Sequence, residues 1–494
     1  MNTTRRTIAK NASFLMLAQL GTWLLTMVNL VFLTRYLGAE DVGRIHLATS
    51  IWAIMGLVVE LGTELLITKE VARAPEKLAE LIGTSIVLRV IAFVIGFGLV
   101  AQYTYTVEYG PITTSVIFVI GISSLVSQIG GNYQAALQGL ERMEFFSLSD
   151  VTAKTITLFL TIIFLVQGYG VLTIAFITIV GALVNMIIPF IAVKRMQSLR
   201  FKFRWSQALW MLKASFPYLL ISIFLVLYVQ MDVVILSLLL NEEAIGWYSA
   251  ADRLFGTLLF IPSVFITAVF PALSRMYTDG SGTAIKLIQK SFDLMLILSI
   301  PIGLGTILVS HSTVILLFGE EFSNSGQVLA VLGVVLIFTY QNVLIGRYFI
   351  SIDRQNSWTV VMAVATIATI PLDLIFVPFC QARFGNGAIG GAVSFVITES
   401  GMLITGLFML PRKTFGLNNV WVAARAGIAG AVMMVVTWPL RHMFILIPIL
   451  VGGITYLVLI LGLRVIPEED WLLLKSMSRN ILARFRKPKS ELPA

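Results

Sequence analysis

The sequence predicts an all-α polytopic membrane protein with about fourteen transmembrane helices, arranged as two six-helix lobes and two C-terminal helices. Three observations support this prediction. Of the 494 residues, 57% are hydrophobic and only 12% are charged, and the mean hydropathy is +0.91. Soluble domains do not have this composition. Long apolar runs recur along the chain, and short sequence similarities link its two halves.

Each apolar run is long enough to cross a bilayer, because about 20 residues of helix span the hydrocarbon core. The runs lie at 12–34, 43–67, 81–102, 112–137, 147–167, 171–193, 215–240, 247–273, 287–310, 326–350, 357–380, 387–410, 421–440 and 444–465. The first run is longer than the hydrophobic region of a signal peptide, so we expect a retained span.

Positive charge is distributed unequally between the loops of the two sides. Most of the 35 Lys and Arg residues fall in loops on one side, and the loop exceptions are Arg35, Arg44, Arg383 and Arg441. Since cytoplasmic loops carry the excess of positive charge, both termini are expected in the cytoplasm of a cell-membrane protein. This topology explains the net charge of +9 without a nucleic-acid partner.

Residue types that would indicate a metal or redox site are scarce. Cys380 is the single cysteine, and His46, His311 and His442 lie far apart, without the spacing of metal ligands. The sequence also contains no phosphate-binding loop of the GxxxxGK[ST] type. It therefore predicts neither a metal nor another cofactor.

Three short similarities relate the two halves of the chain at an offset of about 200 residues. Residues 12–14 resemble 214–216, 40–43 resemble 242–246, and 140–142 resemble 352–354. The predicted domains are a first lobe at 1–200, an interfacial elbow at 201–214, a second lobe at 215–412, two helices at 413–466 and a basic cytoplasmic tail at 467–494. Parallel repeats of this kind usually have a substrate site between them.

Charged residues inside the apolar runs are candidate functional positions, since each costs ~2.5–3.5 kcal/mol near a helix centre. Asp252 and Arg253 lie in the run that begins at Gly246. One interpretation is that they face a cavity inside the bundle. The alternative is that Arg253 extends to the outer interface.

A second group of charges lies in the cytoplasmic half of the first lobe. Glu60 and Glu64 are predicted one turn apart on one face of a continuous helix, and Arg89 and Lys154 at a similar depth. The four residues are expected to form one polar patch. Extension of Glu64 and Lys154 to the interface is the alternative.

A third group lies in the second lobe. Asp232, Arg253 and Asp373 fall in its outer half, so Arg253 is expected to be a counter-ion for an aspartate, in a functional site or in a structural salt bridge. Glu399 has no basic neighbour at its depth. A carboxyl group there is expected to take up a proton, either as a proton carrier or as a neutral hydrogen-bonded group.

Uncharged polar residues extend these groups, either as a path for a ligand or as contacts between helices. They are Gln19, Asn29, Gln128, Asn132, Gln134, Tyr228, Gln230, Gln341 and Asn342. Prolines at 189, 217, 262, 301 and 371 are expected to kink their helices.

Two segments carry a resemblance to a known family. FLTRYLGAEDVG at 32–43 and GWYSAADRLFGTLLFIPSVFITAVFPALSRMY at 246–277 resemble the polysaccharide-biosynthesis flippases. These are Wzx-type transporters of the multidrug/oligosaccharidyl-lipid/polysaccharide exporter superfamily. The resemblance implies a V-shaped pair of six-helix lobes around a central cavity that opens alternately to either side. It also implies a polyprenyl-diphosphate-linked oligosaccharide as substrate, moved from the cytoplasmic to the outer leaflet.

The resemblance also implies cationic residues in the cavity, and Arg253 matches the arginine of the eighth span. Arginine suits the oxygens of a diphosphate. The candidate substrate-binding residues are Arg253, Arg89, Lys154, Arg35, Gln128, Asn132 and Tyr228. The candidate ion-coupling or counter-ion residues are Glu60, Glu64, Asp232, Asp252, Asp373 and Glu399. The coupling ion is expected to be a proton or sodium, and the protein a monomer.

Two other functions stay open at this point. A cation-coupled multidrug exporter of the same superfamily would use acidic cavity residues, which this chain also has. A membrane-bound sugar polymerase or glycosyltransferase would need a sizeable extramembrane loop or a metal-binding carboxylate cluster. Neither is visible in the sequence, so a transporter is predicted rather than an enzyme.

Overall fold

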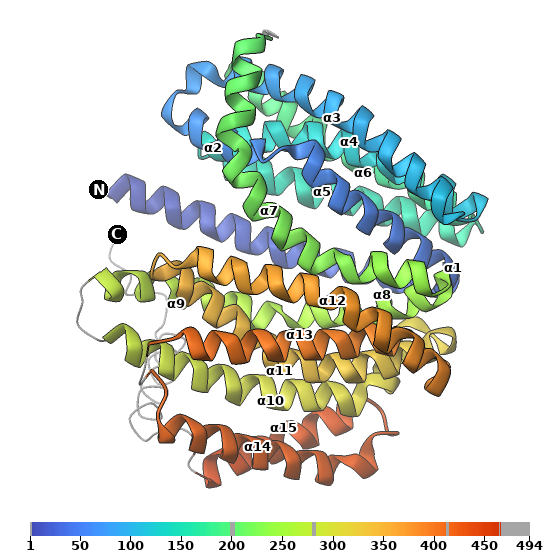
Figure 1. Ribbon diagram of the computed structural model, residues 1–494, viewed down its shortest axis with the longest axis vertical. Coiled ribbons are helices and arrows are strands. Elements are labelled where there is room, and N and C mark those ends of the chain that lie inside the picture. Colours follow the sequence, from blue (N-terminus) through green and yellow to red (C-terminus); the bar gives the residue numbers. More distant parts are fainter. Residues whose placement is uncertain (1, 198–202, 279–282, 412–413, 464, 466–494) are drawn as a thin grey trace, which may run out of the picture. The chain divides into compact units, whose positions relative to one another are not determined.

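The computed structural model describes residues 2–197, 203–278, 283–411, 414–463 and 465, and within them all regular structure is helical (Figure 1). The α-helices are α1 Asn2–Glu60, α2 Thr63–Arg73, α3 Leu78–Val107, α4 Pro111–Gly139, α5 Met143–Val166, α6 Val171–Met196, α7 Trp205–Leu239, α8 Glu242–Leu258, α9 Phe260–Thr278, α10 Thr283–Phe318, α11 Ser323–Ser351, α12 Gln355–Phe384, α13 Ala388–Met409, α14 Leu417–Thr437 and α15 Leu446–Gly462. Short 3-10 helices are η1 Pro75–Lys77, η2 Glu320–Phe322 and η3 Trp438–Leu440. The all-α prediction is confirmed. The tail predicted at 467–494 lies outside the described residues, as do residues 201 and 202 of the elbow.

Eleven helices in the described part of the chain are long and apolar enough to cross a membrane, and Val226–Leu239 and Leu446–Gly462 are shorter apolar helices. The predicted count of about fourteen spans stays a prediction. The first predicted run and most of the second fall in α1, where Gly38 interrupts the helix with φ 78° and ψ 178°. Glycine permits this conformation because it has no Cβ.

The run predicted at 43–67 is also interrupted. α1 ends at Glu60, Leu61 and Gly62 have φ of 56° and 68°, and α2 begins at Thr63. A Cβ on Gly62 would lie 2.7 Å from the Ser215 carbonyl oxygen of α7, so only glycine fits this approach. The prediction that Glu60 and Glu64 lie one turn apart on a continuous helix is therefore wrong.

The run at 247–273 divides into α8 and α9, and Pro262 explains why. Proline has no N–H, so the carbonyl four residues earlier loses its helical hydrogen bond. That carbonyl belongs to Leu258, the last residue of α8. The Tyr340 hydroxyl on α11 donates to it at 2.7 Å. The same arrangement recurs in α10, where the Tyr456 hydroxyl donates at 3.0 Å to the Ile297 carbonyl, four residues before Pro301.

The chain divides into two compact units. The first comprises residues 1–257, 314–331 and 356–402. In it α4 packs against α6, α3 and α2, and α1 packs against α4, α5 and α7. Trp52 of α1 stacks on Phe93 of α3 and donates from its indole nitrogen to the Ile117 carbonyl of α4 at 2.7 Å. These contacts fix the rotation of α1 against α3 and α4.

The second unit comprises residues 258–313, 332–355 and 403–494. Its described core joins α10 to α14 and α15, which lie side by side in Figure 1. Ala426 and Ala429 of α14 are fully buried, and Tyr456 of α15 is 6% exposed. Asn419 donates to both carboxylate oxygens of Asp293 at 2.9 Å, so the start of α14 is bonded to α10. The lobe boundaries predicted from the repeat stay a prediction.

Candidate functional site

A cavity of about 430 Å³ lies within the first unit, between helices α1, α7 and α8. This volume is in the usual range of ligand sites, ~300–1,000 Å³. Its lining residues are Trp23, Thr26, Met27, Leu30, His46, Thr49 and Ser50 of α1, Val229 and Gln230 of α7, and Asp252, Arg253, Gly256 and Thr257 of α8. The cavity thus combines apolar walls with a few polar groups, as ligand sites usually do.

Arg253 is exposed on the wall of this cavity. In the part of the chain that the structure describes, its guanidinium forms no ion pair within 4.0 Å. The expected direct pairing of Arg253 with Asp232, Asp252 or Asp373 is therefore not present. Asp252 lines the same cavity and forms no ion pair with the neighbouring Arg253. The guanidinium donors of Arg253 are thus available to a ligand.

His46 also lines the cavity, although it was not among the predicted site residues, because the three histidines lack the spacing of metal ligands. The side chain is 7% exposed, and neither ring nitrogen has a hydrogen-bond partner among the described residues. Its position in an apolar run was the available signal, since buried polar side chains in membrane helices tend to be functional.

Gln230 and Ser50 form a polar contact across the cavity wall. The Ser50 hydroxyl donates to the Gln230 amide oxygen at 2.9 Å, which joins α1 to α7. The amide oxygen is thereby used, and the amide NH₂ remains as a donor. Together with Arg253, it makes this part of the cavity rich in hydrogen-bond donors.

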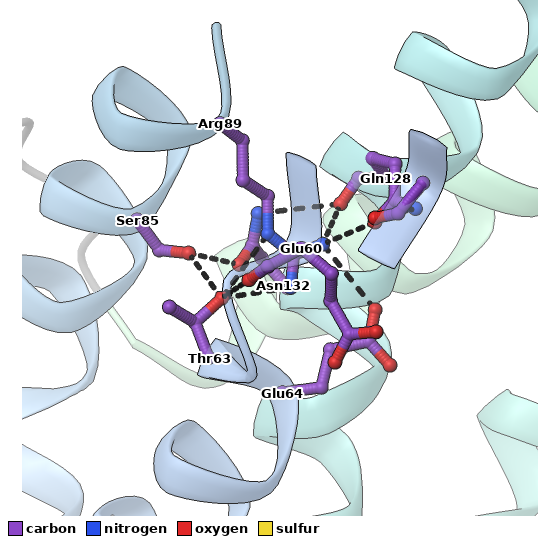
Figure 2. Close-up of polar contacts among 8 residues, drawn as sticks. Glu60, Thr63, Glu64, Ser85, Arg89, Gln128 and Asn132 are labelled. Carbon is purple, nitrogen blue, oxygen red and sulfur yellow. Dashed lines mark hydrogen bonds and ion pairs between the residues drawn. The ribbon is translucent and has the colours of Figure 1, made fainter. Parts of the chain in front are cut away.

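Arg89 occupies a different environment, at the break between α1 and α2 (Figure 2). Its side chain is fully buried. Nε and Nη2 donate to the Thr63 hydroxyl at 3.2 and 2.9 Å, and Nη1 donates to Glu64 Oε1 at 3.3 Å. Nη1 also contacts the Gln128 backbone carbonyl and donates to Gln128 Oε1 at 3.2 Å. All three guanidinium nitrogens therefore have protein acceptors, and Arg89 has no free face for a diphosphate in this arrangement.

Further hydrogen bonds extend the Arg89 network to neighbouring helices. The Ser85 hydroxyl donates to the Asn132 side-chain oxygen at 2.6 Å and lies 3.1 Å from the Thr63 hydroxyl. Gln128 donates to the Gly56 carbonyl of α1 at 3.1 Å. Gln128 and Asn132, expected to contact substrate, are thus part of a network that holds α1 to α4 together.

The acidic members of the predicted patch remain partly accessible. The Glu64 side chain is 40% exposed, and in Figure 2 Glu60 and Glu64 extend to the same side of the break. Lys154 does not join them. Its ammonium lies 3.9 Å from Asp150, one turn earlier in α5, and Lys154 is not a lining residue of the cavity. The patch therefore consists of Glu60, Glu64 and Arg89.

Arg35 has a structural partner. Its Nε and Nη2 donate to the Leu317 and Leu316 carbonyls at 2.9 and 2.5 Å. These carbonyls lie in the last turn of α10, where no following helical turn supplies N–H donors to them. Arg35 therefore caps the end of this helix.

The remaining acidic candidates are buried in the first unit. Tyr228 of α7 donates to Glu399 of α13, which is 2% exposed. Tyr248 of α8 donates at 3.2 Å to Asp232 of α7. Asp373 of α12 is fully buried. Tyr228 is thus a hydrogen-bond donor to an acid and does not line the cavity.

A family model described as "Polysaccharide biosynthesis protein" matches residues 8–277, more than half of the chain. The chain belongs to this family. The matched range contains every lining residue of the cavity and the whole Arg89 network.

Several curated relatives resemble this chain. A putative O-antigen transporter of Escherichia coli K12 is 23% identical over 419 residues, which cover 83% of this chain and 98% of the relative. The succinoglycan biosynthesis transport protein ExoT of Rhizobium meliloti is 22% identical, covering 98% of this chain and 97% of the relative. The probable low-salt glycan biosynthesis flippase Agl15 of Haloferax volcanii is 26% identical over 173 residues, and the match spans 36% of that protein.

Solved structures show which fold this chain has. A structure of the lipid II flippase MurJ in an inward closed conformation matches with a TM-score of 0.74 at 16% identity, covering 91% of this chain and 98% of MurJ. An inward-facing multidrug resistance transporter of the MATE family matches with a TM-score of 0.64 at 16% identity, covering 78% and 93% of the two chains. The protein has the fold of these transporters.

Proposed function

We propose that this protein is a flippase that moves a polyprenyl-diphosphate-linked oligosaccharide from the cytoplasmic to the outer leaflet of the cell membrane by alternating access. The observation that carries the proposal is the exposed guanidinium of Arg253, without an ion pair in the described chain, on the wall of a cavity between apolar helices. Its donors suit phosphate oxygens, and low-dielectric surroundings strengthen the attraction. The names of the relatives, an O-antigen transporter and a glycan biosynthesis flippase, support the same substrate class.

The proposal also includes the remaining features of the mechanism. The diphosphate binds at Arg253, the Gln230 amide assists, and the prenyl chain stays in the lipid. Transport breaks no covalent bond, so the protein is a transporter without enzymatic chemistry. It acts as a monomer in the cell membrane with both termini in the cytoplasm, and a proton or sodium gradient drives the cycle through the buried acids.

The test is a flipping assay with a fluorescent polyprenyl-diphosphate sugar in proteoliposomes. Arg253→Ala should reduce flipping about 10- to 100-fold, since a hydrogen bond to a charged group contributes ~1.5–3 kcal/mol. Arg253→Lys should recover part of it. Arg383→Ala, at an exposed position on α12, is the matched control. Unchanged flipping in correctly inserted Arg253→Ala would contradict the proposal.

A second function is favoured by one observation, the three buried acids Asp232, Asp373 and Glu399 of the first unit. Carboxyl groups of this kind suit a cation-coupled exporter of organic cations. In that case the same proteoliposomes would move an organic cation in response to an imposed gradient and would not flip the lipid. Substitution of the acids, rather than of Arg253, would then abolish transport.

A further inference from the structure

We propose that His46 binds a hydroxyl group of the sugar attached to the diphosphate, and so makes the cavity selective for glycosylated over bare polyprenyl diphosphate. The inference rests on the proposed function and adds a specificity-determining residue to it. It assigns two adjacent subsites in one cavity, with Arg253 and the Gln230 amide for the phosphates and His46 for the sugar.

The His46 imidazole is buried and has no hydrogen bond within the described protein. Its side chain is 93% inaccessible, it lines the cavity, and both ring nitrogens lack partners among the described residues. A buried polar group without a hydrogen bond costs ~1–3 kcal/mol, so such groups normally have a partner. The cavity provides open space beside this imidazole, since His46 is one of its lining residues. A ligand in the cavity therefore supplies the partner.

The chemistry of the ring indicates which ligand group it binds. A neutral imidazole has one N–H donor and one nitrogen acceptor. A phosphate oxygen accepts hydrogen bonds only, and so satisfies one nitrogen at most. A sugar presents several hydroxyl groups, and because each can donate and accept, a hydroxyl can pair with either ring nitrogen. The ring therefore matches a sugar better than it matches a phosphate.

The other groups that line the cavity are consistent with separate subsites for the phosphates and the sugar. Thr49 donates to the Ile45 carbonyl at 2.7 Å and Ser50 donates to Gln230, so their hydroxyl protons are used within the protein. Asp252 and Arg253 are the charged groups that line the cavity with His46. The cavity volume of about 430 Å³ accommodates a diphosphate with the adjoining sugar rather than a whole long glycan. Selectivity is thus exerted on the first sugar.

The experiment compares two fluorescent lipids in proteoliposomes, polyprenyl diphosphate carrying one N-acetylhexosamine and polyprenyl diphosphate without a sugar. His46→Phe keeps a ring of similar size without nitrogens, and His46→Gln keeps one donor and one acceptor. If His46→Phe does not insert, His46→Leu replaces it. His311→Gln, at an exposed histidine on α10, is the control for replacing a histidine by glutamine elsewhere in the protein.

We expect His46→Phe to raise the half-saturating concentration of the glycosylated lipid about 10-fold, the equivalent of two ordinary hydrogen bonds. The bare diphosphate should be flipped as by the wild type, and His46→Gln should restore most of the preference for the sugar. An equal loss with both lipids, or no change with either, would overturn this inference while leaving the flippase assignment intact. Failure of the wild type to flip either lipid would overturn both.

Discussion

Gly43 of α1 and Gly246 of α8 meet where the two helices cross. A Cβ on Gly43 would lie 2.8 Å from the Gly246 backbone nitrogen, and a Cβ on Gly246 would lie 2.7 Å from the Ala39 carbonyl carbon. Each glycine ends one of the two short segments, 40–43 and 242–246, that resemble each other in sequence. The segment 242–246 thus packs on the segment 40–43 through backbone contacts that only glycine allows.

We expect Gly246→Ala and Gly43→Ala to destabilise the protein by ~1–3 kcal/mol or more, because the added methyl group meets backbone atoms that cannot move aside. Thermal unfolding of the purified protein measures the effect. Gly98→Ala on α3 is the control, since nothing lies within 4 Å of an added Cβ there. If the Gly246→Ala protein were as stable as the control, α1 and α8 would be able to move apart without a loss of stability.

The pairing of tyrosines with prolines predicts a non-additive effect. Tyr340→Phe leaves the Leu258 carbonyl without a donor and should cost ~1–3 kcal/mol. Pro262→Ala restores the backbone N–H that proline lacks, so Tyr340→Phe should cost less than half as much in that background. The measurement is a double-mutant cycle on thermal stability.

Tyr456→Phe with Pro301→Ala should give a second cycle of the same sign, because Tyr456 donates to the Ile297 carbonyl. Tyr105→Phe, at an 81% exposed tyrosine, should have no effect. Strictly additive costs in both cycles would show that the hydroxyls do not replace the missing N–H groups.

The Arg89 network predicts that lysine cannot replace this arginine. A lysine ammonium lacks the planar fork that reaches Thr63, Glu64 and Gln128 together. Arg89→Lys should therefore lower the free energy of unfolding by about 1–3 kcal/mol. Glu64→Gln should cost less, because water hydrates the 40% exposed Glu64 side chain and weakens its ion pair.

A direct substrate contact at Arg89 would give a different result. Arg89→Lys would then unfold like the wild type and would raise only the half-saturating concentration of the lipid. Thermal unfolding and flipping by the same preparation, corrected for the folded fraction, separate the two roles. We expect the loss of flipping to follow the loss of folded protein.

The hydrogen bond from Tyr228 to Glu399 makes Glu399 the acid to test for coupling. Glutamine keeps the shape of the side chain but cannot gain or lose a proton. We therefore expect flipping by Glu399→Gln to stop responding to an imposed proton gradient, with little change in its rate without a gradient. Glu320→Gln, at an exposed carboxylate of η2, is the control. An undiminished response would remove Glu399 from the coupling mechanism.

Part of the candidate site was predictable from residue identity. One of the two interpretations of Arg253 was that it faces a cavity inside the bundle, and its side chain lines a cavity. Glu60, Glu64, Arg89 and Lys154 were expected in one patch. The first three share one, although a break replaces the predicted continuous helix, and Lys154 lies beside Asp150 instead. Which of the charged side chains have hydrogen-bond partners within the protein was not predictable. Arg35 and Arg89 have the same charge as Arg253, but helix carbonyls and a buried network occupy their donors.

The sequence by itself determined that the chain is helical and built to cross a membrane, because these properties depend on composition summed over about 20 neighbouring residues. It also indicated the family, because the two segments that resemble it, 32–43 and 246–277, are each continuous in the sequence. The tertiary structure alone decided which polar groups have partners. His46 faces open space, whereas Tyr340 meets the carbonyl exposed by a proline 78 residues earlier, at Pro262. Such pairings depend on how the helices rotate and pack against one another, and local sequence does not encode that rotation.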